Sequence, residues 1–222
     1  MLPENEQFLI ALKELKSASW VYLTLAVNSV LFGLFGIAGS SGPKLSVIQS
    51  VLNSFIVLLF AIVYRKEILP ALKIVNLKKT VLLFLIATVL IFICMFIYFW
   101  VFQLVGFKID RITKSFLEAK MPFWLLVVTV SILPGIFEEI AFRGVIFAKL
   151  KSFLTTKEVL IIQAAAFSAL HISPLIFISH FAMGLIFGWL RIQSQSLFPG
   201  MLLHALWNYF VIWTEIHGSR IL

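Results

Sequence analysis

The decisive stretch of this chain is Gly135-Ile136-Phe137-Glu138-Glu139-Ile140-Ala141-Phe142-Arg143-Gly144, in which two adjacent carboxylates and an arginine fall within six residues. The sequence on either side is apolar enough to lie in lipid. Each ionisable group at mid-bilayer costs about 3 kcal/mol on insertion scales. Charged side chains within membrane segments face the interior of the helix bundle and mark functional sites. We therefore interpret Glu138, Glu139 and Arg143 as parts of a site enclosed by helices.

The composition of the whole chain indicates a membrane protein. Of its 222 residues, 61% are hydrophobic and 13% are charged, and the mean hydropathy is +1.05. Soluble domains carry about 45–50% apolar and about 25% charged residues. The length alone would suit one soluble domain. Apolar runs as long as these, however, exceed what a single soluble core can bury.

About seven segments are long enough to cross the roughly 30 Å hydrocarbon layer. We predict an all-α, multi-pass transmembrane bundle with spans at 18–38, 46–64, 80–105, 122–150, 157–171, 174–190 and 198–213. The fourth span contains Pro134 and Gly135 directly before the acidic pair, and this dipeptide should kink or break the helix. The fifth span is short, so we expect it to be tilted or to stop before the far side.

The chain is predicted to be a single domain with three parts. Apolar residues at helical spacing in 1–17 predict a short amphipathic, interfacial helix along the membrane surface. Residues 18–121 would form the N-terminal transmembrane helices, and residues 122–216 would form a catalytic transmembrane core. A second surface segment is expected at 108–120 for the same reason as the first.

The net charge of +8 favours an orientation in the membrane over a nucleic-acid partner, which we do not expect. With the N-terminus inside, eleven of the 18 basic residues fall on the cytoplasmic side and six on the outer side, while Arg143 lies within the bilayer. This excess favours a cytoplasmic N-terminus. The abundance of Phe, Ile and Lys indicates an AT-rich bacterial gene. We therefore expect a multi-pass protein of the bacterial plasma membrane, with the lipid bilayer as its surroundings.

Two further motifs place polar groups within predicted spans. Phe167-Ser168-Ala169-Leu170-His171 ends the fifth span, and His204-Ala205-Leu206-Trp207-Asn208 lies in the seventh. His204 and Asn208 are four residues apart and so share one helical face. At about 1.5 Å per residue, Glu138, His171 and Asn208 lie about 18, 21 and 15 Å from the cytoplasmic side. Three helices would thus supply one buried polar pocket.

Glu139 and Arg143 are also four residues apart, so they can pair along one helix and lower the cost of burying both charges. Glu138 points about 100° around the same helix, given 3.6 residues per turn, and has weaker compensation. This difference predicts that Glu139 and Arg143 organise the site, whereas Glu138 is available for chemistry.

The predicted pocket suits hydrolysis by an activated water. Glu138 and His171 would hold and deprotonate the water. His204 and Asn208 would donate hydrogen bonds to the oxyanion that forms when water adds to an amide carbonyl. No signature of a covalent serine nucleophile, such as G-x-S-x-G, accompanies these residues.

Three motifs in this order on successive membrane segments resemble the CAAX protease and bacteriocin-processing family, also called the Abi family: Glu138-Glu139-x-x-x-Arg143, Phe167-x-x-x-His171 and His204-x-x-x-Asn208. The resemblance covers about 123–213, under half of the chain. The family consists of multi-pass intramembrane glutamate proteases, of which the eukaryotic type cuts prenylated C-terminal tails. The resemblance implies that Glu138 and His171 activate water and that His204 and Asn208 stabilise the oxyanion. It gives Glu139 and Arg143 the organising role.

The resemblance implies a mechanism that needs no cofactor. Two histidines and two glutamates would suit zinc in principle. Zinc is the less favoured alternative, because H-E-x-x-H, whose spacing puts two ligands on one helical face, is absent.

We predict an intramembrane endopeptidase that hydrolyses a peptide bond of a membrane-associated peptide or protein, in bacteriocin or signal-peptide maturation or in self-immunity. The alternative is a non-catalytic membrane immunity or binding protein, or a small proton-coupled transporter with a Glu/His relay. A transporter would be expected to show repeated halves, and none is apparent.

Two other features receive a structural interpretation. Gly184-x-x-x-Gly188 is interpreted as a place where helices pack closely within the chain, in preference to a dimerisation motif. His180 lies outside the motifs and is interpreted as a hydrogen-bonding residue of the core.

Overall fold

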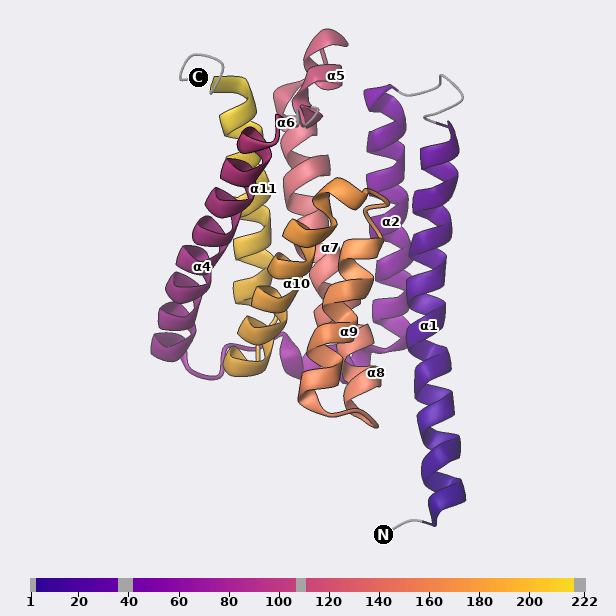
Figure 1. Ribbon diagram of the computed structural model, residues 1–222. Helices are drawn as coiled ribbons and strands as arrows, with labels where there is room; N and C mark the ends of the chain where they lie inside the picture. Colours follow the sequence, from indigo (N-terminus) through magenta and orange to yellow (C-terminus); the bar gives the residue numbers. More distant parts are fainter. Residues whose placement is uncertain (1–2, 36–41, 107–110, 218–222) are drawn as a thin grey trace.

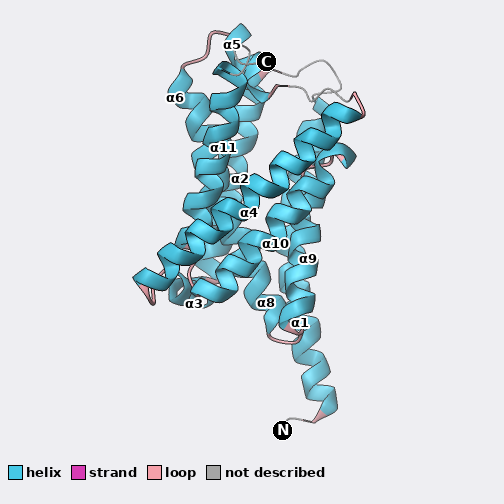
Figure 2. Ribbon diagram, turned by 60° about the vertical axis from the view of Figure 1, so that its left-hand side comes forward, coloured by secondary structure: helices cyan, strands magenta, loops and turns pink. Residues whose placement is uncertain are grey.

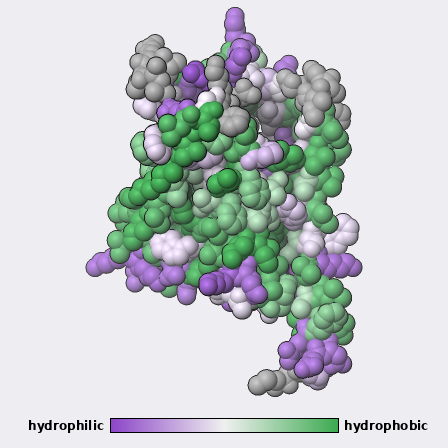
Figure 3. Space-filling model, in the orientation of Figure 1, coloured by the Kyte–Doolittle hydropathy of each residue, from purple (hydrophilic) through white to green (hydrophobic). Residues whose placement is uncertain are grey.

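The computed structural model describes residues 3–35, 42–106 and 111–217, which form helices and contain no strand (Figure 1). The all-α class predicted from the sequence is confirmed. Figure 3 shows apolar side chains over the middle of the molecule and hydrophilic side chains gathered toward its two ends. That surface pattern suits a bundle whose middle lies in lipid.

The long helices run alternately up and down the bundle, and α4 crosses the others obliquely on the outside (Figures 1 and 2). The long helices are α1 (Glu4–Phe35), α2 (Pro43–Val63), α4 (Leu77–Leu104), α9 (Thr156–Ala169), α10 (Pro174–Ser194) and α11 (Phe198–His217). Short elements α3 (Arg65–Ile68), η2 (Leu69–Ala71) and α5 (Ile112–Glu118) lie between them. A further long rod is built of α6 (Phe123–Leu126), η3 (Val127–Ile132), α7 (Leu133–Glu139), η4 (Ile140–Ile146) and α8 (Phe147–Lys151).

The first helix corrects one expectation. Residues 1–17 were predicted to form a separate surface helix, but α1 runs without interruption from Glu4 to Phe35, and its first turns extend beyond the rest of the bundle (Figure 1). No glycine or proline lies between Glu4 and Val30, so nothing in the local sequence would end the helix at Ser17. The expected surface segment at 108–120 lies partly outside the described residues.

Five of the described helices are long and apolar enough to cross a membrane: Glu4–Leu34, Pro43–Val63, Leu77–Leu104, Phe123–Lys151 and Pro174–Ser194. The two other predicted spans correspond to α9 and α11. With 14 residues, α9 is about 21 Å long, and its turn into α10 lies below the upper ends of α2 and α11 (Figure 1). The α9–α10 pair therefore ends within the bundle, which is where the Phe167–His171 motif is placed.

The rod from Phe123 to Lys151 continues as helix through Pro134, where a kink or a break was predicted, so the break is absent. It contains π-helical turns at η3 and η4, on either side of α7. Proline has no N–H, so the carbonyl of Val130 loses its usual helical partner. The side chain of Asn208 donates a hydrogen bond of 3.1 Å to that carbonyl, and Ser50 donates one of 2.7 Å to the neighbouring carbonyl of Thr129. Side chains of α11 and α2 thus satisfy backbone groups that lipid could not.

Small residues bring the rod, α9, α10 and α11 together. A Cβ atom on Gly184 would lie 2.8 Å from the Cα atom of Ala164, and one on Gly188 would lie 2.5 Å from the side chain of Gln163. A Cβ atom on Gly135 would lie 2.7 Å from the backbone nitrogen of Ala205. The interpretation of Gly184 and Gly188 as close-packing positions is confirmed for the contact between α9 and α10. The third glycine joins α7 to α11 in the same way.

Replacing Gly184 by Ala should therefore destabilise the bundle by about 1–3 kcal/mol, the usual cost of overpacking a tight interface. The measurement is the thermal denaturation midpoint of the purified protein in detergent. Gly33→Ala is the matched control, because Gly33 is also helical and nothing lies within 4 Å of its added Cβ. Equal midpoints for the two variants would contradict the packing account.

Candidate active site

An ion pair buried from all sides lies at the centre of the site. Arg143 Nη1 is 3.1 Å from Glu139 Oε1, and the two side chains are 0% and 1% exposed. Both residues belong to the rod, Glu139 at the end of α7 and Arg143 in η4. The pairing predicted from their spacing is therefore present. Neither charge has access to solvent, so each depends on the other and on nearby polar groups.

Helix α10 and two aromatic rings complete the surroundings of Arg143. Its Nη2 donates a 3.3 Å hydrogen bond to the carbonyl of Gly184, which also accepts a 2.9 Å bond from Gln163. The guanidinium carbon lies 4.5 Å from the ring centroid of Phe167 and 5.3 Å from that of Phe187. A cation over the face of an aromatic ring is attracted by the ring quadrupole. Arg143 thus joins the rod to α9 and α10.

His204 connects this pair to the second carboxylate. Its Nδ1 lies 3.1 Å from Glu139 Oε1, and its Nε2 lies 3.9 Å from Glu138 Oε2. The imidazole is stacked on Phe187, with centroids 5.1 Å apart. Because a carboxylate only accepts, Nδ1 carries the proton shared with Glu139, which leaves Nε2 directed toward Glu138. The adjacent glutamates are therefore bridged by one histidine from α11.

Glu138 differs from Glu139 in its surroundings, as predicted. Its side chain is 25% exposed, yet its Oε2 atom is buried without a hydrogen-bond partner among the described residues. Glu138 lines a cavity of about 640 Å³ that is also lined by His171. An unpaired buried acceptor costs free energy, so its presence calls for an explanation such as a function.

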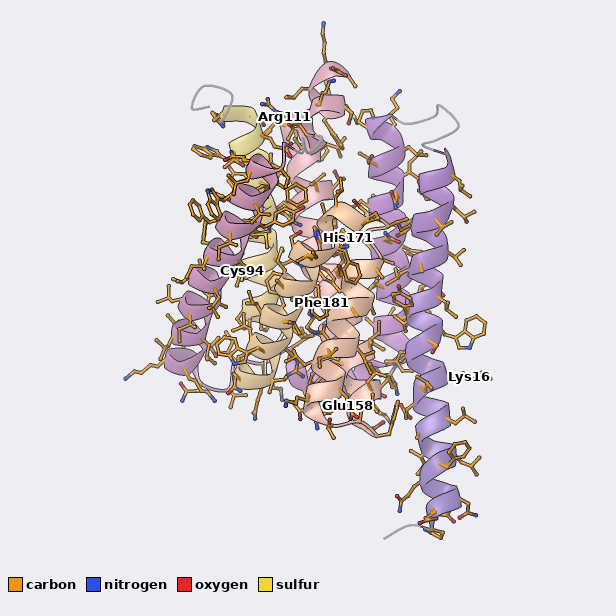
Figure 4. The ribbon with its side chains drawn as sticks, in the orientation of Figure 1. Lys16, Cys94, Arg111, Glu158, His171 and Phe181 are labelled. Atoms are coloured by element: carbon orange, nitrogen blue, oxygen red, sulfur yellow. The ribbon has the colours of Figure 1, made fainter. Side chains whose placement is uncertain are left out.

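His171 lies at the turn after α9, at a level between those of Arg111 and Glu158 (Figure 4). Its Nδ1 is 3.0 Å from the carbonyl oxygen of Phe167. A carbonyl only accepts, so Nδ1 is the donor, and Nε2 of the neutral ring carries a lone pair. In the described part of the chain no hydrogen bond or ion pair joins Glu138 to His171. Both side chains line the same cavity.

Asn208 is placed differently from the other predicted site residues. Its amide is committed to the carbonyl of Val130, and neither Asn208 nor His204 lines the cavity shared by Glu138 and His171. One N–H of the Asn208 amide remains for another acceptor. Its predicted place in an oxyanion site stays a prediction, whereas its contact with the π-helical turn before Glu138 is a feature of the fold.

Phe167 is the residue whose role the sequence analysis missed. Its ring centroid lies 4.5 Å from the guanidinium of Arg143 and 5.1, 5.8 and 6.0 Å from the rings of His171, His204 and His180. His180 itself lies 4.1 Å from His171, centroid to centroid. Phe167 was quoted only as part of a motif, and His180 was assigned to the core. An apolar ring gives no signal by itself, since many of the 23 phenylalanines face lipid or the core.

Across residues 3–35, 42–106 and 111–217, no group of three or more His, Cys, Asp and Glu side chains is arranged to hold a metal ion. Of the two glutamates and two histidines considered for zinc, Glu139 is paired with both Arg143 and His204.

Comparison with known families gives one match. Residues 120–210 match a family model described as type II CAAX prenyl endopeptidase Rce1-like. This segment resembles a CAAX prenyl endopeptidase. The resemblance drawn from the three motifs is therefore confirmed, and the match contains all six predicted site residues. No curated protein and no solved structure matches the chain.

The match supports a peptidase of the CAAX type, and the apolar helices support a multi-pass membrane protein. The matched segment begins just before α6 and ends within α11, so α1, α2 and α4 lie outside it. The helices that carry the candidate catalytic residues are thus those that resemble the family.

The central ion pair leads to a stability prediction. Arg143→Met leaves the Glu139 carboxylate buried without its guanidinium, which should destabilise the protein by about 3–5 kcal/mol. Glu139→Gln combined with Arg143→Met removes both charges and should recover a large part of that loss. Unfolding of the purified proteins in detergent would measure both effects. A double variant as unstable as Arg143→Met would show that the loss does not come from the unpaired charge.

Proposed function

We propose that this chain is an intramembrane endopeptidase that cleaves a peptide bond of a membrane-associated peptide or protein. The observation that carries the proposal is the unpartnered Oε2 atom of Glu138, beside His204 and on the wall of the cavity that also holds His171. The match of residues 120–210 to the CAAX prenyl endopeptidase family supports the same reaction class.

In this mechanism a water bridges Glu138 and His171. Glu138 accepts one proton from the water, and the Nε2 lone pair of His171 orients it through the other. The water oxygen bonds to the carbonyl carbon of the scissile peptide, and the carbonyl oxygen becomes an oxyanion. Collapse of this tetrahedral species breaks the C–N bond, and the proton held by Glu138 moves to the leaving nitrogen. Glu138 and His171 line one cavity, and no hydrogen bond or ion pair joins them among the described residues, so the proposed water would take the place of a direct bond.

The neighbouring charges support this cycle. Two carboxylates and one guanidinium carry a net charge of one negative, which a proton on His204 would balance while Glu138 stays ionised as the base. The Nε2–H of His204, directed toward Glu138, would donate a hydrogen bond to the oxyanion and keep its proton. Asn208 would add its remaining amide N–H. Glu139 and Arg143 fix His204 and the rod, so they act as positioning residues.

The substrate would reach this site from within or beside the membrane. We propose a bacterial plasma-membrane location with a cytoplasmic N-terminus, because α3 and α8, rich in basic residues, lie at the same end of the bundle as the start of α1 (Figure 2). Maturation of bacteriocins or signal peptides, or self-immunity, would suit such a location.

Loss of the proposed base should abolish cleavage. Glu138→Gln and His171→Ala should each lower kcat/KM by about 100- to 10,000-fold, as expected for a general acid–base group. The measurement is cleavage of a peptide mixture, and of a farnesylated Cys-a-a-X peptide, by purified protein in lipid nanodiscs with mass-spectrometric detection.

Two exposed residues provide matched controls for these variants. Glu118→Gln and His217→Ala make the same chemical changes away from the site and should cut as fast as wild type. Full activity in Glu138→Gln and His171→Ala would make the site assignment wrong. A non-catalytic binding protein, the alternative function, would cut nothing in any form and would tolerate the loss of single polar groups.

The mechanism also predicts the effect of metal removal. Exhaustive dialysis against a chelator should leave the rate of cleavage unchanged, because water is activated by Glu138 and His171 alone. The rate before and after dialysis is compared with that after Zn²⁺ is added back. Activity that disappears with the chelator and returns with Zn²⁺ would establish a zinc-dependent mechanism instead.

A further inference from the structure

The cavity beside Glu138 is built largely by helices outside the family match. Its volume of about 640 Å³ lies in the range of ligand-binding pockets, about 300–1,000 Å³. One wall consists of α1 and α2, and the other consists of η3, α7 and the turn after α9. The family match begins at residue 120, so the wall formed by α1 and α2 belongs to the part of the chain that the match does not cover.

Helix α2 turns a polar face toward this cavity. The polar residues of α2 that line it are spaced three or four residues apart along one helical face: Ser46, Gln49, Ser50, Asn53 and Ser54. The opposite face carries exposed apolar side chains, including Ile48, Leu52 and Phe55. In a membrane helix, polar residues on the inner face of a bundle interact with other helices or with a polar ligand.

Part of this polar face is committed to the fold. Ser50 donates to the carbonyl of Thr129, and Ser54 donates to the carbonyl of Ser50. The side-chain oxygen Oδ1 of Asn53 accepts a 2.7 Å hydrogen bond from the side-chain amide of Asn28 in α1. These bonds hold α1, α2 and the rod together around the cavity.

The remaining polar groups have no protein partner. Among the described residues, nothing bonds to the side chain of Gln49 or to the amide nitrogen of Asn53, and both residues line the cavity. The Gln49 amide offers what a peptide bond offers, a donor and an acceptor side by side, and Asn53 adds the N–H donors of its amide nitrogen. An extended peptide strand is therefore the ligand whose groups these two side chains match.

The dimensions suit a short stretch of such a strand. From Ser46 to Asn53, seven residues along α2, the polar face extends over about 10 Å, which equals about three residues of an extended strand at 3.3 Å each. Apolar residues such as Leu25, Val57 and Leu133 line the same cavity and would contact substrate side chains. An isoprenoid or acyl chain in this place would leave the free amides unpaired, at a cost in free energy.

We propose that Gln49 and Asn53 form a subsite that binds the main chain of an extended, unmodified peptide segment next to the scissile bond. The subsite rests on the proposed peptidase function, because Glu138 and His171 lie on the wall that faces it. Helices α1 and α2 therefore select the substrate by its backbone, while the family-like helices perform the hydrolysis.

The test uses a peptide that the wild-type protein cleaves in the mixture assay. Gln49→Leu and Asn53→Leu should each raise KM roughly tenfold, the scale of one lost hydrogen bond, and leave kcat nearly unchanged, as for uniform binding. Gln103→Leu is the matched control, because it makes the same change on an exposed position of α4. Asn53→Leu also breaks the hydrogen bond to Asn28, so the thermal denaturation midpoint of this variant is measured alongside. Gln49→Leu breaks no bond within the described residues and is therefore the variant that tests the subsite.

A second arm removes the hydrogen bond from the side of the peptide. Single backbone esters replace successive amides near the cleavage site. One ester should raise KM for wild type by about the same factor as Gln49→Leu, and the two changes together should have no further effect. Additive effects at every ester position would overturn a direct contact between Gln49 and the substrate backbone.

Filling the cavity gives an independent outcome. Nothing lies within 4 Å of an added Cβ on Gly33, which lines the cavity from α1. Gly33→Leu should therefore fold normally but obstruct the subsite and lower kcat/KM at least tenfold. If wild type cleaves peptides while Gln49→Leu, Asn53→Leu and Gly33→Leu all match Gln103→Leu, only the subsite is disproved. If wild type cleaves no peptide at all, the proposed function fails and the subsite fails with it.

Discussion

The buried ion pair between Glu139 and Arg143 is the interaction on which the site depends. Two charges without solvent exposure are tolerated only when each is compensated. Compensation here comes from three helices, through the Gly184 carbonyl, the Phe167 and Phe187 rings and the His204 imidazole. The rod, α9, α10 and α11 must therefore pack together for either charge to be buried. This requirement fixes where His204 lies and so sets the surroundings of Glu138.

The same helices satisfy the backbone at the weak point of the rod. Proline at 134 frees a carbonyl within the membrane, and the π-helical turn before it needs partners from outside the helix. Asn208 of α11 and Ser50 of α2 supply them, at the carbonyls of Val130 and Thr129. Ser50 also lies on the polar face of α2, so this one helix both lines the cavity and bonds to the π-helical turn η3. The local irregularity of the rod is thus tied to the packing that forms the cavity.

Different parts of the chain serve different parts of the proposed reaction. The segment that resembles CAAX prenyl endopeptidases supplies the carboxylates and histidines. Helices α1 and α2, which lie outside that segment, supply the facing wall of the cavity. In this proposal one segment carries the reacting groups and another carries the binding wall. Substitutions in the binding wall could therefore change the substrate preference and leave the charged centre unaltered.

The sequence by itself determined the helical class, the membrane-like composition, the Glu139–Arg143 pair and the three motifs, because these depend on hydropathy and on spacing along one helix. It did not determine that α1 is continuous, that Pro134 leaves the rod unbroken, or that Phe167 lies among four polar side chains. Those features depend on contacts between residues far apart in the chain, such as Asn208 with Val130. Only the tertiary structure decided that Glu138 lies beside His204, 3.9 Å from its Nε2 atom, and that α2 presents free amide groups to the cavity. Helical spacing gives the face on which a side chain lies, whereas helix packing decides what that face meets.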